Sequence, residues 1–238
     1  MSIIIGVPLR YQKFDDDRAI LYVSERLRRT IQKAGGFVFP IVPVQDVDYI
    51  HTRGCDFNEL SSDEKLLIDE YLEYCDGIIF PGGIKFTPYD RYLLEQIISK
   101  KIPVLGICLG MQMMSCYGED INLNLIDEDN SHYQEDDFSL SHKVILDKNS
   151  KLYRIFGQDE IMVNSFHKKC VSENEIYKVV GKSMDGVIEA IEYSSDVFNI
   201  GIQWHPEISY EFDDNSMKLI DTFIDECKKS KLNKLSVK

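Results

Sequence analysis

The sequence has 238 residues, of which 44% are hydrophobic and 28% are charged, as in an ordinary globular protein. This length provides one full-sized core, so we expect a single domain over residues 1–238. The formal net charge of -13 repels phosphate groups, which argues against nucleic acid or an anionic membrane as a partner.

The chain opens on an apolar run at residues 3–8 that no basic segment precedes. This pattern is typical of a buried first strand and differs from that of a signal peptide. No apolar run approaches the roughly 20 residues that a membrane-spanning helix needs. We therefore expect a soluble protein.

The first half of the chain alternates short apolar runs with amphipathic stretches. This alternation predicts an α/β fold in which helices flank a central, mostly parallel sheet. The predicted strands cover residues 3–8, 37–42, 77–80 and 102–107. The predicted helices cover residues 17–34, 61–72 and 89–100, and Ser61 with Glu64 forms a capping-box pattern at the start of the second helix.

The second half changes character after a polar, acidic stretch at residues 119–137. Short strand-like runs follow, and we expect them to be antiparallel. They cover residues 144–146, 161–163, 177–180, 187–193 and 198–204. A helix over residues 215–227 closes the predicted fold.

One cysteine occupies a special position in this pattern. Cys108 follows the predicted strand at 102–107 and stands at the centre of Gly106-Ile-Cys-Leu-Gly110. Glycines on both sides permit the tight strand-to-helix turn of a nucleophile elbow, with the thiol exposed at the edge of the sheet. The positive end of the following helix would favour a negatively charged sulfur. We therefore expect Cys108 to be a nucleophile.

The other cysteines carry no such context. The six form no CxxC pair and no zinc-type spacing with histidine, so we expect no metal site and a reducing, cytoplasmic environment. We expect buried structural roles for Cys75, Cys116, Cys170 and Cys227.

A general base stands near the other end of the sequence. His205 ends an apolar strand, and Glu207 follows two residues later. Strand alternation places Ile200, Ile202 and Trp204 on one face. A histidine at one strand end can meet a cysteine at another strand end in the same sheet, so Cys108, His205 and Glu207 form a candidate catalytic triad.

Two backbone segments are candidates for an oxyanion hole. The turn containing Gly82 and Gly83 follows the predicted strand at 77–80, and the N–H of Leu109 follows the nucleophile. The remaining histidines lack a strand-end and acid context and are individually typical of surface residues, although two of them, His142 and His167, are candidates to border the site. These four histidines are His51, His132, His142 and His167.

The chain resembles the class I glutamine amidotransferase superfamily in three motifs: Pro81-Gly-Gly83, the stretch 106–112 around Cys108, and Gly201-Ile-Gln-Trp-His-Pro-Glu207. The motifs Ala34-Gly-Gly36, Asn164-Ser-Phe-His167 and Asp185-Gly186 with Glu189-Ala190 are similar to its γ-glutamyl-γ-aminobutyrate hydrolase branch, a stand-alone, peptidase-like group.

The resemblance implies a flavodoxin-like, three-layer fold and hydrolysis of a γ-glutamyl amide through a thioester on Cys108. It implies no metal or organic cofactor. It adds a set of substrate-binding candidates, which are Gln112, His142, Asn164, Ser165 and His167. The chain departs from the branch in a shortened segment at residues 83–92, in Leu123-Asn124, and in Lys169, where the branch commonly has Gln. These departures leave the amine of the substrate open.

Two alternatives remain at this point. A glutaminase subunit that delivers ammonia to a partner synthase would share the triad, and a non-catalytic binding protein could keep the same fold. The stand-alone motifs favour the hydrolase, and the presence of all three triad residues argues against a silent homologue. The sequence also leaves open whether the protein forms a homodimer.

Overall fold

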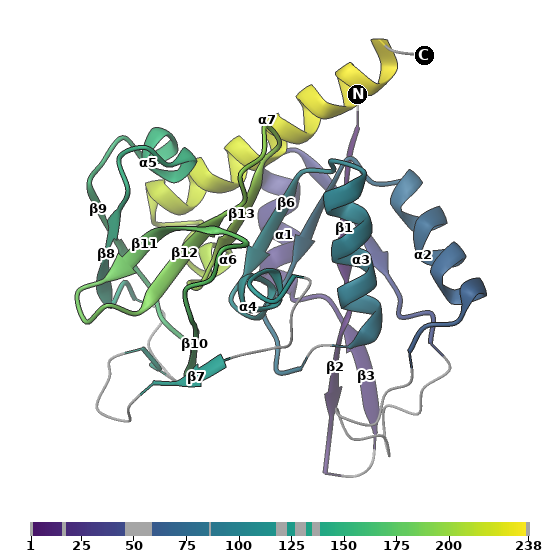
Figure 1. Ribbon diagram of the computed structural model, residues 1–238, viewed down its shortest axis with the longest axis horizontal. Helices are drawn as coiled ribbons and strands as arrows, with labels where there is room; N and C mark the ends of the chain where they lie inside the picture. The colour runs from purple at the N-terminus through teal and green to yellow at the C-terminus, as the bar shows by residue number, and fades with distance from the viewer. Residues whose placement is uncertain are drawn as a thin grey trace.

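The structure is a computed structural model, and it describes residues 2–15, 18–45, 59–85, 87–117, 123–126, 132–134 and 139–236. A nine-stranded sheet forms its centre, in the order β4-β1-β5-β6-β13-β12-β11-β8-β9 (Figure 1). The first five strands in this order run parallel and are β4 (Gly36–Ile41), β1 (Ile3–Pro8), β5 (Gly77–Phe80), β6 (Val104–Ile107) and β13 (Asn199–Ile202).

The other four strands continue the sheet in antiparallel fashion. They are β12 (Ile188–Glu192), β11 (Lys178–Ser183), β8 (His142–Leu146) and β9 (Glu160–Val163). The expectation of antiparallel strands in the second half is therefore confirmed for these four strands. It is wrong for the pairing of β13 with β6. This strand pairs in parallel with β6 and antiparallel with β12, so the chain returns to the centre of the sheet. That return brings the end of β13 beside the end of β6.

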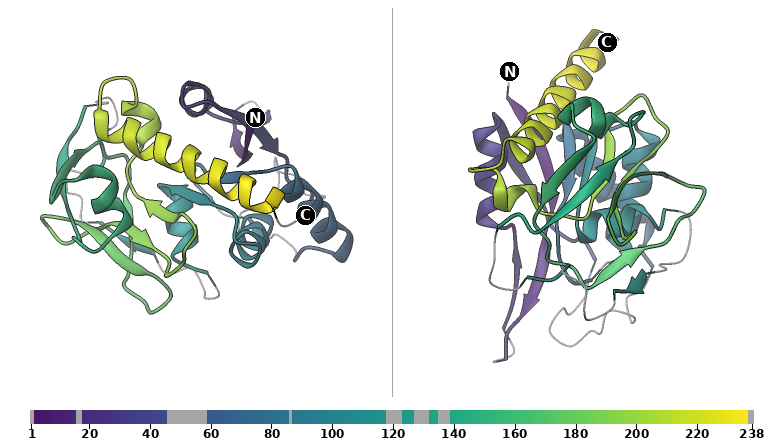
Figure 2. Two further views of the ribbon diagram at one scale, coloured as in Figure 1. Left: turned by 90° about the horizontal axis from the view of Figure 1, so that it is seen from above. Right: turned by 90° about the vertical axis from the view of Figure 1, so that its left-hand side faces the viewer.

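Helices cover both faces of the sheet and make three layers. The helices on one face are α1 (Glu25–Lys33), α5 (Lys151–Phe156), α6 (Pro206–Ser209) and α7 (Asp214–Ser236). Those on the other face are α2 (Ser62–Glu73), α3 (Pro88–Ser99) and α4 (Leu109–Met114). In Figure 1, α3 lies in front of the sheet beside β1, and α1 lies behind the sheet near β6. Figure 2 shows α7 crossing much of the width of the molecule.

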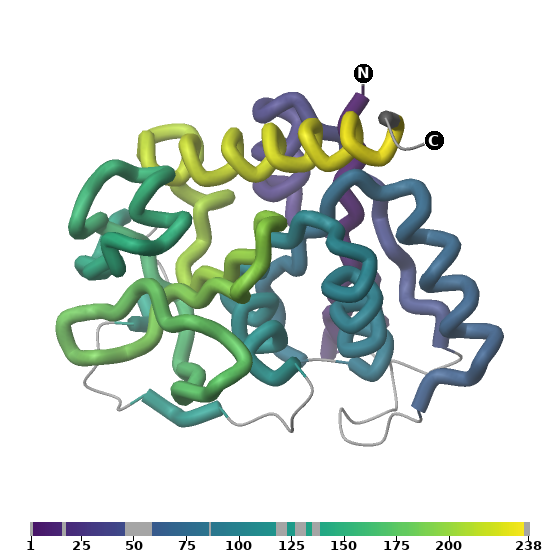
Figure 3. The backbone as a smooth tube through the Cα atoms, turned by 45° about the horizontal axis from the view of Figure 1, so that its top comes forward, coloured from purple at the N-terminus to yellow at the C-terminus, as the bar shows by residue number. Residues whose placement is uncertain are grey.

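Each face has its own apolar core, and strand alternation decides which side chain joins which core. Ile79, Leu105 and Ile107 pack with α1 and α7. Ile78 and Phe80 pack with α2, α3 and α4. Ile200, Ile202 and Trp204 all belong to the first core, as the alternation of the strand predicts. Figure 3 shows α2 and α3 beside the parallel half of the sheet and α7 along the top.

A hairpin replaces part of a predicted helix. The pattern at residues 17–34 predicted one helix, but β2 (Arg10–Lys13) pairs antiparallel with β3 (Ala19–Tyr22), and α1 begins only at Glu25. Ile20, whose spacing suggested a buried helical face, is 43% exposed on the hairpin. Pairing with β2 satisfies the backbone of β3 and overrides the local apolar periodicity.

Two further features complete the description. A small ribbon pairs β7 (Leu123–Leu125) with β10 (Lys169–Val171). Ser61 and Glu64 form the predicted capping box at the start of α2. Most of the acidic stretch 119–137 lies outside the described residues. No helix in the described part of the chain is long and apolar enough to cross a membrane.

Candidate active site

Cys108 occupies a strained turn between β6 and α4. Its backbone has φ 51° and ψ -103°, a conformation that side-chain-bearing residues rarely adopt. A Cβ atom at Gly110 would collide with the carbonyl oxygen of Phe80, and one at Gly106 would lie 2.8 Å from the carbonyl carbon of Gly110. The glycines on both sides are therefore required by the close approach of the turn to β5 and to the start of α4.

The elbow is tied to the strand that carries the candidate base. The backbone N–H of Cys108 donates to the carbonyl oxygen of Ile202 at 2.8 Å. Because β6 and β13 are parallel neighbours, their carboxyl ends lie at the same edge of the sheet. Cys108 is only 8% exposed, so the expectation of an exposed thiol was wrong: the residue belongs to the same buried apolar cluster as Leu105 and Ile107 of β6.

His205 lies between a carboxylate and the thiol. Its Nδ1 lies 2.7 Å from Oε1 of Glu207, and Cys108 is within hydrogen-bonding reach of the ring. Burial lowers the pKa of His205, but its interactions with Glu207 and with Cys108 raise it more, so the pKa stands well above its usual value. The structure thus brings the predicted residues Cys108, His205 and Glu207 together, and their catalytic roles stay a prediction.

The other described cysteines lie in different surroundings. Cys75, Cys116 and Cys227 are buried, as expected, and Cys170 is half-buried. Burial raises the pKa of Cys75 to about 12 and also raises the pKa of Cys227. Both therefore remain neutral thiols near neutral pH.

The predicted oxyanion loops border the triad. A Cβ atom at Gly82 would lie 2.7 Å from Cε1 of His205, so the glycine turn passes directly over the imidazole ring. A Cβ atom at Gly83 would lie 3.0 Å from the Leu109 side chain. Leu109 is the first residue of α4, so its N–H has no partner within its own helix. A cavity of about 420 Å³ adjoins Gly82, Gly83 and His205.

A buried ion pair holds the glycine turn, and the sequence did not predict it. The guanidinium of Arg10 lies 2.7 Å from Oδ1 of Asp90, and both side chains are almost fully buried. Arg10 also donates to the carbonyl oxygen of Pro81 at 3.3 and 3.4 Å. Asp90 accepts from the N–H and the hydroxyl of Thr87 at the start of α3. The shortened segment 83–92 therefore places the start of α3 against the candidate oxyanion loop.

Three predicted substrate-binding residues use their side chains as internal supports. The Asn164 amide donates to the carbonyl oxygen of His205 at 2.8 Å, and its Oδ1 accepts from the His205 N–H at 2.8 Å. The Ser165 hydroxyl donates to the carbonyl oxygen of His132. Gln112 donates to Lys169 and to Gln203. Direct contact of these residues with substrate stays a prediction. What the structure shows is that their side chains form hydrogen bonds with residues around the site.

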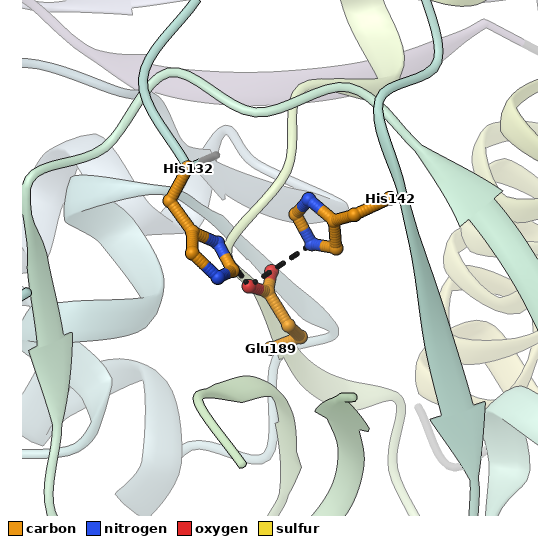
Figure 4. A group of neighbouring side chains, drawn as sticks. All are labelled: His132, His142 and Glu189. Atoms are coloured by element: carbon orange, nitrogen blue, oxygen red, sulfur yellow. Dashed lines mark ion pairs between the residues drawn. The ribbon is translucent and has the colours of Figure 1, made fainter. Parts of the chain in front are cut away.

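The predicted residues His142 and His167 gather elsewhere, around a buried carboxylate. Together with His132 they surround Glu189 on β12, and we name this group the histidine cluster (His132, His142, His167 and Glu189) (Figure 4). His132 is 1% exposed and His167 is 4% exposed, so the expectation that these histidines are surface residues was wrong. The buried charge of Glu189 explains their position. His51 lies outside the described residues.

Comparisons with known proteins show the family of the chain. The family model described as Peptidase C26 matches residues 87–207, which include Cys108, His205 and Glu207. The chain belongs to the Peptidase C26 family. This is a hydrolase and peptidase family with class I glutamine amidotransferase-like members, as the sequence motifs predicted.

Relatives and solved structures extend the match. A Schizosaccharomyces pombe protein named "Putative glutamine amidotransferase" is 34% identical over 186 residues, covering 64% of this chain and 70% of that protein. The γ-glutamyl-γ-aminobutyrate hydrolase of Escherichia coli O157:H7 is 26% identical over 196 residues, covering 69% of this chain and 76% of that protein. The glutaminase domain of Trypanosoma brucei CTPS has the same fold, with a TM-score of 0.61 at 14% identity, covering 96% of this chain and 94% of that one.

Two of the departures from the C26 hydrolase pattern lie side by side. Leu123–Leu125 and Lys169–Val171 form the β7–β10 ribbon, in which Asn124 pairs with Cys170. The Asn124 side chain donates to the Ser172 hydroxyl at 2.7 Å. The carbonyl oxygen of Lys169 accepts from Gln112, one turn after the nucleophile. The substituted positions thus form one continuous element that contacts the nucleophile helix.

Proposed function

We propose that this C26 protein hydrolyses the γ-glutamyl amide bond of a small γ-glutamyl conjugate and releases glutamate and an amine. The observation that carries the proposal is the position of His205 between Glu207, at 2.7 Å, and the thiol of Cys108. This arrangement supplies a nucleophile, a proton carrier and a group that orients it. A reducing cytoplasm would suit the free thiol.

In the first half-reaction, His205 already holds the shared proton, and the sulfur of Cys108 attacks the γ-carbonyl carbon of the substrate. The negative charge moves to the carbonyl oxygen, where the N–H groups of Leu109 and of the Gly82-Gly83 turn would stabilise it. The intermediate collapses with cleavage of the C–N bond. The leaving amine takes the proton from His205, and a γ-glutamyl thioester remains on Cys108.

In the second half-reaction, water attacks the thioester carbon and gives a proton to His205. Cleavage of the C–S bond releases glutamate, and His205 keeps the proton for the next cycle. Glu207 keeps a proton on Nδ1 of His205, so that the other ring nitrogen faces the reacting atoms in both steps. No step needs a group beyond the protein, the substrate and water.

A glutaminase role with ammonia delivery to a synthase is the second candidate. The match to the glutaminase domain of a CTPS favours it, because that domain covers nearly the whole of this chain. The two candidates share the triad and differ in the leaving group and in the need for a partner. The identity to the E. coli hydrolase, which extends over 196 residues, favours the stand-alone reaction.

The test is glutamate release from a panel of γ-glutamyl amides that includes glutamine, γ-glutamyl-γ-aminobutyrate and γ-glutamyl polyamines. We expect rapid release from one conjugate, slow release from glutamine, and no release by Cys108→Ala. Rapid release from glutamine alone would favour the glutaminase. No release from any member would contradict the proposed hydrolase and favour a binding protein.

A further inference from the structure

The histidine cluster brings three imidazole nitrogens to one carboxylate oxygen. Oε1 of Glu189 lies 3.1 Å from Nδ1 of His132, 3.3 Å from Nε2 of His142 and 3.4 Å from Nε2 of His167. Figure 4 shows the rings of His132 and His142 turned toward Glu189. The residues come from four separate segments of the chain, so no short sequence spacing announces the group.

The outer ring nitrogen of each histidine is already committed to a hydrogen bond. Nδ1 of His167 faces the carbonyl oxygen of Lys169 at 3.1 Å, and this oxygen can only accept. Nε2 of His132 faces Oδ2 of Asp185 at 3.1 Å, where it donates to the carboxylate. These two rings therefore carry their protons on the outer side, which leaves lone pairs on the inner nitrogens when the rings are neutral.

His142 also carries its proton on the outer ring nitrogen. The Ser141 hydroxyl donates to the carbonyl oxygen of Val163 at 3.2 Å, so its oxygen accepts from Nδ1 of His142 at 3.3 Å. The inner nitrogen of His142 then also presents a lone pair to Glu189. Among the described residues, Nε2 of His142 and both carboxylate oxygens of Glu189 are buried without a hydrogen-bond partner. Such polar atoms are costly unless a proton or a cation satisfies them.

Four of the six distances between the donor atoms are close to those of a tetrahedral site. Metal–nitrogen and metal–oxygen bonds of about 2.0–2.1 Å place tetrahedral ligand atoms about 3.3–3.4 Å apart. The three contacts to Glu189 fall near this value, and Nδ1 of His132 lies 3.3 Å from Nε2 of His167. The donor atoms of His132, His142 and Glu189 all lie within 4.8 Å of one another.

Charge and burial favour a divalent cation over extra protons. The side chains of His132, His167 and Glu189 are at most 2% exposed, and that of His142 is 12% exposed. Glu189 and the neighbouring Asp185 carry two negative charges, which one divalent cation neutralises. Two extra protons would balance the same charge, but they would satisfy only two of the three inner nitrogens, whereas one cation can accept a lone pair from all three.

We propose that the histidine cluster binds one divalent transition-metal ion, Zn²⁺ by its donor set, in a closed structural site. Three imidazoles and one carboxylate are ligands that Zn²⁺ prefers, and hydrogen bonds donated by the outer ring nitrogens are typical of metal-bound histidines. Four protein ligands leave no open position for substrate or water. The ion therefore stabilises the structure and takes no part in the hydrolysis, and the inference is independent of the proposed function.

The segment 164–167 connects the histidine cluster with the candidate active site. His167 follows Phe166, whose ring packs edge-on against that of His205 with centroids 5.7 Å apart. Asn164, in the same segment, forms hydrogen bonds with the backbone N–H and the carbonyl oxygen of His205. A metal ion on His167 would therefore fix the segment 164–167 that supports the candidate base.

Metal binding itself is the test. Full-length protein is stripped with a chelator and titrated with ZnCl₂ by calorimetry, and with Co²⁺ by visible absorption. We expect one equivalent of Zn²⁺, the intense absorption of tetrahedral Co²⁺, and a rise in the melting temperature with Zn²⁺.

Matched variants locate the site. Asp185→Ala removes an outer hydrogen-bond acceptor and should weaken Zn²⁺ binding about 10- to 100-fold, and Glu189→Gln should weaken it further. Glu160→Gln makes the same change at an exposed carboxylate, and Cys108→Ala removes the elbow thiol. Both controls should bind Zn²⁺ as the unaltered protein does.

Three results would overturn the proposal. The first is the absence of stoichiometric Zn²⁺ binding by the unaltered protein. The second is unchanged affinity in Asp185→Ala, whose side chain is 36% exposed and which should fold even if Glu189→Gln does not. The third is a set of ¹⁵N resonances in which the inner nitrogens of the three histidines carry protons and do not respond to Zn²⁺.

Discussion

Asn164 and His205 are joined by two reciprocal hydrogen bonds, each 2.8 Å long, between the side-chain amide of Asn164 and the backbone of His205. The pair connects the end of β9 with the end of β13. Asn164 is fully buried, and its Nδ2 also lies 3.2 Å from the Ser209 hydroxyl in α6. The candidate base is therefore held by its backbone as well as by its contact with Glu207.

Asn164→Ala should lower the free energy of unfolding by about 1–3 kcal/mol, because the buried polar groups of His205 lose their partners. It should also lower kcat more than it raises KM, since the base loses its position. Asn164→Asp keeps the acceptor and loses the donor. Its stability and its kcat should therefore lie between those of the unaltered protein and those of Asn164→Ala. Urea unfolding and steady-state kinetics measure both effects. An Asn164→Ala variant with unchanged kcat would contradict the positioning role.

The strained backbone of Cys108 gives a second prediction. At φ 51° a side chain is unfavourable by about 1–3 kcal/mol, whereas glycine is permitted, at a cost of roughly 0.5–1 kcal/mol in chain entropy. Cys108→Gly should therefore be at least as stable as Cys108→Ala, although both lack the nucleophile. Urea unfolding compares them. A clearly less stable Cys108→Gly would argue that the turn carries no strain.

Much of this site follows from local sequence, and the rest depends on contacts between distant segments. The elbow at Cys108 and the pair His205 and Glu207 were predicted because each motif carries its own constraint, such as glycines in a tight turn. The hairpin at Ala19–Tyr22 was missed because its partner strand decides its conformation. The ion pair of Arg10 with Asp90 was missed because 80 residues separate its members.

That ion pair gives a third prediction. Asp90→Asn leaves the buried guanidinium of Arg10 without a countercharge and should destabilise the protein by about 3–5 kcal/mol. Because Arg10 also holds the Pro81 carbonyl, kcat should fall as the glycine turn loosens. The double variant Arg10→Met/Asp90→Leu should recover only part of the stability, because Thr87 still loses its acceptor, and should not recover kcat. Recovery of both would mean that the pair does not position the turn.

The protonation of His205 gives a fourth prediction. Its pKa is raised by Glu207 and by Cys108, so the folded state binds the proton more tightly than the unfolded state does, in which a histidine titrates near about 6.5. The resulting stability is fully present below about pH 6.5 and is lost as the pH rises through the folded pKa.

Ring ¹⁵N NMR should show His205 protonated well above pH 6.5 in the unaltered protein and a lower pKa in Glu207→Gln. The difference in unfolding free energy between these two proteins should shrink as the pH rises through the folded pKa. An ordinary titration near pH 6.5 in both proteins would contradict the electrostatic account.

The covalent thioester is the most direct test of the central claim. The unaltered protein is mixed with its best γ-glutamyl substrate, quenched in acid within milliseconds, and measured by intact and peptide mass spectrometry beside Cys108→Ala and His205→Asn. We predict a mass increase of one glutamyl group on the peptide that contains Cys108, and no such adduct in Cys108→Ala. Turnover by Cys108→Ala, or an adduct on another residue, would contradict the assignment of Cys108 as the nucleophile.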